Sequence, residues 1–179
     1  MSIFGDKPVY SEEEWALVAR GFNEMGRLAR EKDMIFTVHH HMGTGVQTEE
    51  EIDRLMELTD PNLVYLLYDT GHLAFSGEDA LRVLRKYAKR VKHVHLKSVR
   101  NDVVAKAKAG GYSFLDAVRA GAFTVPGDGD FDFQPVFDIL AENGYEGWVV
   151  VEAEQDPAKA NPLEYAKMAR EYIKKTAGI

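Results

Sequence analysis

A carboxylate and a histidine stand together where an apolar stretch of the chain ends. Asp69 and His72 follow the apolar residues 63–67, within the segment Tyr-Asp-Thr-Gly-His at residues 68–72. An uninterrupted apolar run of this length is typical of a buried parallel strand. Because α/β proteins place their chemistry at the carboxyl ends of such strands, we expect a functional site here.

The histidines of the chain share one property: each lies at or just beyond the end of a predicted strand. They are His39, His40, His41, His72, His93 and His95. Asp69 and Glu152 stand at the ends of two strands as well. The ends of parallel strands meet at one edge of a sheet, and His, Asp and Glu together suit Mn²⁺, Co²⁺, Fe²⁺, Zn²⁺ or Mg²⁺. The pattern therefore indicates a divalent-metal site.

The alternation of side chains along a strand sorts these residues by face. The residues that share a face are His93, His95 and Lys97 in one strand, and His39 and His41 in another. His40 points the opposite way, so a structural role is expected for it, and the same alternative holds for His93, which is farther from its strand end. Asp69 could instead cap a helix, and Glu152 could pair with a surface Lys or Arg.

Four predicted strands carry these groups, with helices between them. The strands cover residues 34–38, 63–67, 91–97 and 148–152. Capping residues and helical periodicity predict helices that begin near Ser11, Thr48, residues 76–79, Gln134 and Asn161. Strands that alternate with helices indicate an α/β fold with a parallel sheet.

The length of the chain limits the architecture. A complete (β/α) barrel needs roughly 250 residues, whereas this chain has 179. A small open sheet and the C-terminal half of a barrel both fit, and we expect residues 1–179 to form one such domain. Residues 98–131 form an insertion rich in Gly and charge, with a short helical pattern at residues 112–119. Insertions of this length within a compact domain more often have a function than serve only as connections.

Composition excludes several classes of protein. A net charge of −7 argues against nucleic-acid binding, and we interpret the basic residues between Lys86 and Lys108 as a solvated face. The chain has no cysteine, which excludes disulfides and thiolate metal sites. No apolar stretch approaches the length of a membrane span, so a cytoplasmic location is expected. The Gly-rich residues 43–45 and 127–129 lack phosphate-binding motifs and are interpreted as turns or a lid.

Several segments together resemble the inosose dehydratases, a branch of the xylose isomerase-like TIM barrels. The segments are residues 39–44, 68–72, 93–97, 125–129 and 147–152. The resemblance covers nearly the whole chain but only the second half of a family member. It implies the C-terminal, roughly four-stranded half of a barrel, and an enzyme of inositol catabolism that removes water from 2-keto-myo-inositol.

The resemblance also implies roles for individual residues. The superfamily binds one divalent metal through Glu, Asp, His and Glu at successive strand ends, and Asp69, His95 and Glu152 match the last three ligands. The first Glu is absent, so His39 or His41 takes its place; we assign His39 to the metal, with Mn²⁺ or Co²⁺ favoured. Histidines on this strand favour the dehydratase branch over the epimerases. The catalytic candidates are His41, His72 and Lys97, of which the last two match positions that face substrate.

The implied reaction is a β-elimination of water. The metal acts as a Lewis acid, a base removes the α-proton, and an acid helps the β-hydroxyl to leave. The sequence does not choose among the candidates for these two proton transfers.

Two alternatives remain open: a sugar isomerase or epimerase of the same superfamily, and a non-catalytic half-barrel. Since half a barrel has two unpaired sheet edges, we expect a homodimer that pairs through them.

Overall fold

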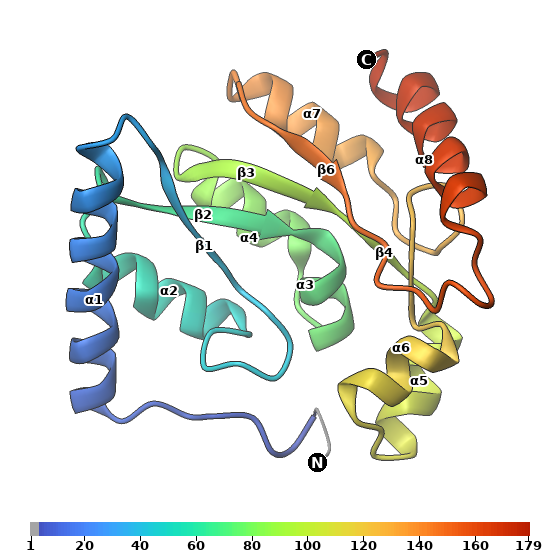
Figure 1. Ribbon diagram of the computed structural model, residues 1–179, viewed down its shortest axis with the longest axis horizontal. Helices are drawn as coiled ribbons and strands as arrows, with labels where there is room; N and C mark the ends of the chain where they lie inside the picture. Colours follow the sequence, from blue (N-terminus) through green and yellow to red (C-terminus); the bar gives the residue numbers. More distant parts are fainter. Residues whose placement is uncertain (1–3) are drawn as a thin grey trace.

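Four parallel strands form the sheet on which the rest of the structure is built (Figure 1). The computed structural model describes residues 4–179. In spatial order the strands are β1 (Phe36–His39), β2 (Val64–Asp69), β3 (Val91–Leu96) and β6 (Val149–Val151). All three neighbouring pairs are parallel. The expected α/β fold with four parallel strands is confirmed.

Five helices follow or precede these strands and had been expected from the sequence. They are α1 (Glu12–Arg30), α2 (Glu49–Leu58), α4 (Ala80–Tyr87), α7 (Gln134–Glu142) and α8 (Pro162–Ala177). The predicted capping boxes form: Ser11 with Glu14 begins α1, and Thr48 with Glu51 begins α2. These caps satisfy backbone N–H groups that a helix leaves without partners in its first turn.

The helix predicted to start within residues 76–79 is α4, and its start is confirmed, but a short helix before it was not predicted. A short helix, α3 (Thr70–Ser76), follows β2 directly and ends at Ser76, and Gly77 takes the left-handed conformation after it. Asp79, the last residue of the predicted start, caps α4 by accepting a hydrogen bond from the backbone N–H of Arg82. With only seven residues, α3 is too short to show a helical periodicity.

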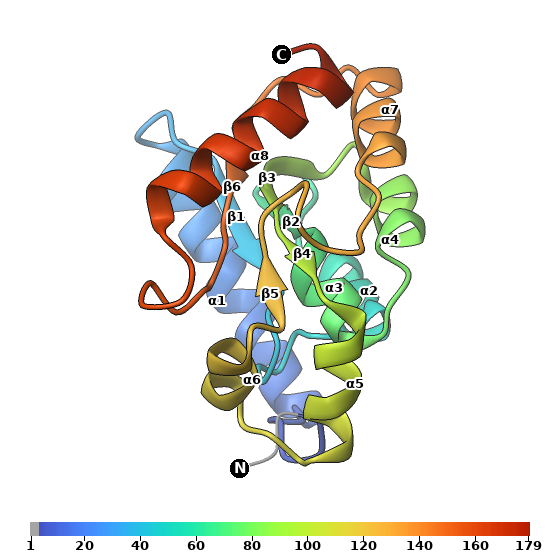
Figure 2. The ribbon, with the colours of Figure 1, turned by 90° about the vertical axis from the view of Figure 1, so that its right-hand side faces the viewer.

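The insertion at residues 98–131 contains two helices and a small antiparallel sheet. Its elements are β4 (Ser98–Val99), α5 (Asn101–Ala109), α6 (Phe114–Ala120) and β5 (Phe123–Thr124). Figure 2 shows α5 and α6 below the paired strands β4 and β5. Only α6 matches a predicted pattern. The insertion packs around an apolar cluster of its own, which includes Val99, Ala107 and Phe123.

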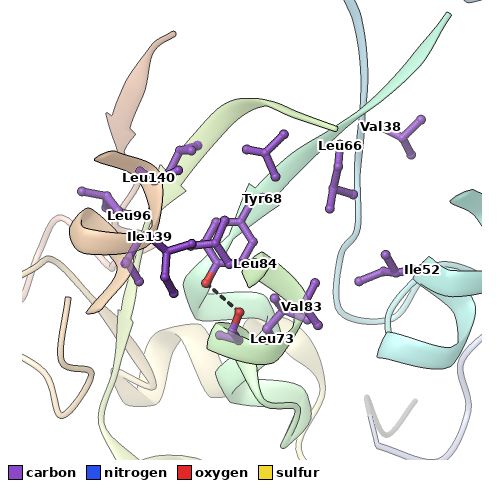
Figure 3. Packing of buried hydrophobic residues seen from close by; sticks show 14 of the residues in the cluster. Val38, Ile52, Leu66, Tyr68, Leu73, Val83, Leu84, Leu96, Ile139 and Leu140 are labelled. Carbon is purple, nitrogen blue, oxygen red and sulfur yellow. Dashed lines mark hydrogen bonds between the residues drawn. The ribbon is translucent and has the colours of Figure 1, made fainter. Parts of the chain in front are cut away.

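One face of the four-stranded sheet is closed by helices. Leu66, Tyr68 and Leu96 point from β2 and β3 into a core that α2, α4 and α7 also line, and all three are fully buried (Figure 3). The hydroxyl group of Tyr68 donates a hydrogen bond to the carbonyl of Ala80 at 2.9 Å, the dashed line in Figure 3. This satisfies the polar atom of a ring that is otherwise packed among apolar side chains.

The opposite face of the sheet is open over much of its area. Val150 lies two residues before Glu152, so the two side chains share this face, and Trp148 follows the same alternation. Large apolar side chains stay exposed on β6 and just before β1 and β6: Ile35 at 61%, Trp148 at 75% and Val150 at 36%. Among residues 4–179, no strand pairs with the outer edge of β1 or β6.

None of the helices within residues 4–179 combines the length and the apolar character that a membrane span requires.

Candidate metal centre

The two carboxylate oxygens of Asp69 have different roles: one caps a helix and the other faces the candidate metal site. Oδ1 accepts hydrogen bonds from the backbone N–H groups of Gly71 at 2.8 Å and His72 at 2.9 Å, and so caps α3. Oδ2 is buried and has no hydrogen-bond partner within residues 4–179. The alternative interpretation of Asp69 as a helix cap is therefore correct for one oxygen. That cap holds the other oxygen in a fixed direction.

The residues predicted to hold a metal come together around Asp69 Oδ2. His39 Nε2 lies 3.3 Å from this oxygen and His95 Nδ1 lies 3.4 Å from it. Glu152 extends from the end of β6, and its Oε2 is 3.0 Å from His95 Nδ1. Four separate strand ends thus deliver His39, Asp69, His95 and Glu152 to one cluster.

Two possible metal-ligand atoms in this cluster lack a hydrogen-bond partner in the described chain, as expected where a cation binds. His39 Nε2 and Asp69 Oδ2 are both buried, and neither has a hydrogen-bond partner in the described chain. Burying such atoms without partners is costly. His39, Asp69, His72 and Glu152 each place one possible ligand atom within 4.8 Å of the others. This set of nitrogen and oxygen ligand atoms suits a divalent metal. It contains His72 in the place of His95, the ligand expected from the sequence.

Lys97 lies at the centre of the same cluster, and its position departs from the solvated face predicted for basic residues 86–108. Its side chain is fully buried, and Nζ is 2.7 Å from Glu152 Oε2 and 2.6 Å from Glu154 Oε2. The ammonium also donates to His72 Nε2 at 2.9 Å. Burial lowers the pKa of Lys97, but the carboxylates of Asp69, Glu154 and Glu152 outweigh it and raise that pKa above its ordinary value. Lys97 is therefore a buried cation.

The segment at residues 69–72 is built to hold Lys97. Thr70 Oγ1 donates to the carbonyl of Lys97 at 2.7 Å and accepts from its backbone N–H at 3.0 Å. Gly71 leaves room for the lysine, because a Cβ at this position would lie 2.5 Å from Lys97 Cγ. His72 then contacts Nζ. Each residue that follows Asp69 in this segment thus contacts a different part of Lys97.

Two of the remaining histidines differ sharply in their surroundings. His40 is fully buried, and its Nε2 accepts a hydrogen bond from the backbone N–H of Asp69 at 3.1 Å. Burial lowers the pKa of His40 to about 3, so the ring is neutral and structural, as the alternation had indicated. His41 donates from Nδ1 to the carbonyl of Met42 at 2.8 Å and keeps 29% of its side chain exposed. Its ring lies 3.8 Å from that of His72, measured between centroids.

His93 is not at a strand end. It lies in the middle of β3, with its ring centroid 5.2 Å from that of His95. Burial and the neighbouring His95 lower its pKa. The prediction that every histidine lies at or just beyond the end of a strand is therefore wrong for His93, because β3 continues to Leu96.

Charges in the cluster are tightly coupled. Hydrogen bonds from His95 and Lys97 lower the pKa of Glu152 to about 2. Burial lowers the pKa of His95, but Asp69 and Glu152 outweigh it and raise that pKa to about 9. His72 behaves in the opposite way, since burial and the Lys97 ammonium lower its pKa far below the usual range despite Asp69. The cluster thus combines ionised carboxylates with a neutral, buried imidazole.

Glu154 belongs to this cluster and was not anticipated. Its carboxylate contacts Lys97, and it lies 3.5 Å from His72 Nε2 and 3.8 Å from His41 Nε2. The backbone of Glu154 takes a left-handed conformation, with φ of 43°. Such strain in a residue other than glycine is often found at functional sites. The only signal in the sequence was the spacing of two from Glu152, which gives the two carboxylates a common face in an extended chain.

An apolar groove borders the cluster. It has a volume of about 620 Å³ and lies between β6 and α8, where Val149, Val151 and Ile173 line it, and Glu154 reaches its wall. None of the four proposed metal ligands lines this groove, so the groove is not the centre of the site.

Proteins named inosose dehydratase resemble this chain along nearly its whole length. The protein of that name from Clostridium tetani is 68% identical over 177 residues, which are 99% of this chain and 59% of the relative. The one from Geobacillus thermodenitrificans is 63% identical over the same shares of the two chains. The chain thus spans about 59% of the length of these curated relatives.

Solved structures share the fold at much lower identity. The crystal structure of the IOLI protein with a bound zinc atom superimposes with a TM-score of 0.72 and 17% identity, over 96% of this chain and 59% of that one. At this identity the likeness establishes the fold alone. A family model described as xylose isomerase-like TIM barrel matches residues 3–176, and the chain therefore belongs to the xylose isomerase-like TIM barrel family.

Proposed function

We propose that this chain is the metal-bearing part of a dehydratase that removes water from 2-keto-myo-inositol. One observation carries the proposal: strand ends far apart in the sequence bring His39, Asp69, His95 and Glu152 to a single cluster with unsatisfied donor atoms. The name shared by the relatives at 62–68% identity supplies the reaction and the substrate class. It also favours a dehydratase over a sugar isomerase or epimerase.

The four residues of the cluster would hold a divalent metal, with Mn²⁺ or Co²⁺ as our preferred ions. Nitrogen and oxygen ligands without thiolates accept either ion. A bound ion would supply Lewis-acid polarisation of the keto group of the substrate. Hydrogen bonds to Asp69 Oδ1 orient the carboxylate, as partners of ligands commonly do in metal sites.

We assign the two proton transfers to His41 and Lys97. His41 is the most accessible of the catalytic candidates. Its Nδ1–H is held by Met42, so Nε2, which lies 3.8 Å from Glu154 Oε1, would remove the α-proton. Lys97 carries a proton that it can donate to the departing β-hydroxyl, which leaves as water when the C–O bond breaks. The resulting enol tautomerises to a diketone. His72 accepts from Lys97 Nζ and orients the ammonium.

Metal binding and turnover test this proposal separately. Chain purified without a nickel column should contain a divalent ion by elemental analysis, and removal with a chelator should lower its unfolding temperature until Mn²⁺ or Co²⁺ is restored. Turnover of 2-keto-myo-inositol should then be detected as diketone formation. A chain with no bound ion and no stabilisation by either metal would contradict the proposal. A panel of ketoses tests the isomerase and epimerase alternative.

The open sheet favours a second possibility, a half-barrel that works only when it associates. The outer edges of β1 and β6 lack strand partners in the described chain, and Ile35, Trp148 and Val150 expose apolar surface on the same face as the cluster. Unpaired edges and exposed apolar patches favour association. We propose a homodimer in which a two-fold axis places β6 of each copy beside β1 of the other.

Mass measurement in solution tests the dimer. Wild-type chain should have twice the monomer mass, and Val150→Asp should shift the equilibrium toward monomer by placing a charge on the open face. Leu17→Asp is the matched control, because Leu17 is exposed on α1, away from this face. A stable wild-type monomer, or equal effects of the two substitutions, would contradict the dimer.

We further propose that residues 1–179 form one domain with an insertion at residues 98–131. The cytoplasmic location stays a prediction, as does the absence of nucleic acid and membrane among the partners. Fluorescence microscopy of a tagged chain in the source cell and a filter-binding assay with nucleic acid test these predictions.

A further inference from the structure

The carboxylate of Glu154 shares the Lys97 ammonium with the proposed metal ligands. Lys97 Nζ lies 2.6 Å from Glu154 Oε2 and 2.7 Å from Glu152 Oε2. It is also 3.4 Å from Asp69 Oδ2, the unsatisfied oxygen of the cluster. One buried cation therefore touches two carboxylates that a divalent metal would use, and one that it would not.

A metal and this ammonium cannot share Glu152 and Asp69 without conflict. Both are cations, and repulsion between charges a few ångströms apart is strong when they are shielded from water. Lys97 cannot move far, because its backbone is held by Thr70 on both sides and its stem lies against Gly71. The ammonium therefore needs a partner that stays available once a metal is bound.

We propose that Glu154 is a positioning residue that keeps the Lys97 ammonium when a divalent metal takes Asp69 and Glu152, the two carboxylates that Nζ also approaches here. This inference rests on the proposed metal site. Glu154 is outside the proposed ligand set, yet it makes the shortest contact to Nζ among the groups around Lys97. Glu154 also has a left-handed backbone, with φ of 43°, a conformation that costs strain in a residue other than glycine.

A second cation is the main competing interpretation of Glu154. His41, His72 and Glu154 place possible ligand atoms within 4.8 Å of one another. However, Lys97 Nζ lies within 2.9 Å of both Glu154 Oε2 and His72 Nε2. A divalent ion at this position would have to displace a buried ammonium that has no other place to go. The contacts therefore favour positioning of Lys97 over a second metal.

A double-mutant cycle on metal affinity tests this inference without any need for turnover. Mn²⁺ is titrated calorimetrically into the metal-free chain of residues 1–179 and into Lys97→Met, Glu154→Gln and the double variant. Lys97→Met should bind Mn²⁺ more tightly, because a competing cation is gone. Glu154→Gln should bind about tenfold more weakly, because the ammonium then stays on Asp69 and Glu152. The double variant should bind like Lys97→Met alone.

Further variants separate positioning from loss of fold. Glu154→Asp keeps the charge and should recover most of the affinity, whereas Glu142→Gln, an exposed position on α7, should leave it unchanged. Circular dichroism and urea unfolding report whether each variant is folded. A misfolded Glu154→Gln would stay weak in the double variant, while positioning predicts recovery.

Three outcomes would overturn the inference. Effects of the two substitutions that simply add would show that Glu154 does not act through Lys97. A stoichiometry of two Mn²⁺ ions, one of them lost in Glu154→Gln, would assign Glu154 to a second metal. Failure of the wild-type chain to bind Mn²⁺ would overturn both this inference and the proposed metal site, whereas additive effects with intact binding would leave that site standing.

Discussion

The two faces of the sheet are built from the same four strands but differ in every other respect. The face under the helices is closed and apolar, with Leu66 and Val94 fully buried. The opposite face carries the charged cluster around Asp69 at the carboxyl ends of the strands, and exposed apolar groups such as Trp148 farther back. Alternation along each strand separates the two sets of side chains.

This difference shows where stability and chemistry come from in the chain. Parallel sheets are normally covered on both faces, and here one face alone supplies the main core. The other face can therefore hold ionised groups such as Lys97 and Glu152 without removing an apolar core, and its uncovered apolar part is available to a second copy. Substitutions on the two faces should have different consequences.

The largest expected effect is on the closed face. Leu66→Ala should lower the free energy of unfolding by about 2–5 kcal/mol, because it leaves a cavity in a fully buried site. Leu67→Ala, the next residue on the open face, should cost less than about 1.5 kcal/mol, because Leu67 is only partly buried. Urea unfolding of both variants measures the difference. Equal losses would show that the two faces contribute alike to stability.

The next effect concerns Asp69. Asp69→Asn keeps an oxygen that can cap α3 but removes the charge, so it should weaken Mn²⁺ binding by more than about 100-fold, beyond the loss typical of residues outside the ligand set. Asp79→Asn is the matched control, because Asp79 caps α4 and has no hydrogen bond to the residues of the cluster. Its Mn²⁺ affinity, measured by calorimetry, should equal that of wild type. Comparable losses in both variants would argue for a capping role alone.

A smaller loss is expected at Gly71, in the short helix α3 that follows β2. Gly71→Ala should cost about 1–3 kcal/mol, because the new methyl group would overlap the stem of Lys97, which has no room to move. The midpoint of thermal unfolding measures this loss. An unchanged midpoint would mean that Lys97 can repack, and would weaken the claim that residues 69–72 hold it.

The smallest effect has the opposite sign. Gly21→Ala should stabilise the chain by about 0.5–1 kcal/mol, because Gly21 lies inside α1 with no atom within 4 Å of an added Cβ. Parallel unfolding experiments on Gly21→Ala and Gly71→Ala compare an open helical glycine with a crowded one. Destabilisation by Gly21→Ala would show that α1 does not tolerate even this exposed change.

Local features of the fold could be predicted because short segments of the sequence determine them. Ser11 and Glu14 form their capping box within one turn, and the apolar run before Asp69 has the length and composition of a strand. The same holds for residues that follow strands, so Asp69, His95 and Glu152 could be chosen as site residues. By contrast, α3 and α5 were missed because short helices without a clear apolar stripe leave no periodicity to detect.

What the sequence determined by itself is therefore the order of strands and helices, their caps, and the set of histidines and carboxylates at the strand ends. Only the tertiary structure decided how these groups are shared: one oxygen of Asp69 caps a helix while the other stays unsatisfied. It also decided that Lys97 is buried between Glu152 and Glu154. The physical reason is that capping and alternation act over a few residues, whereas these contacts join groups up to 57 residues apart in the chain and depend on how whole strands pack.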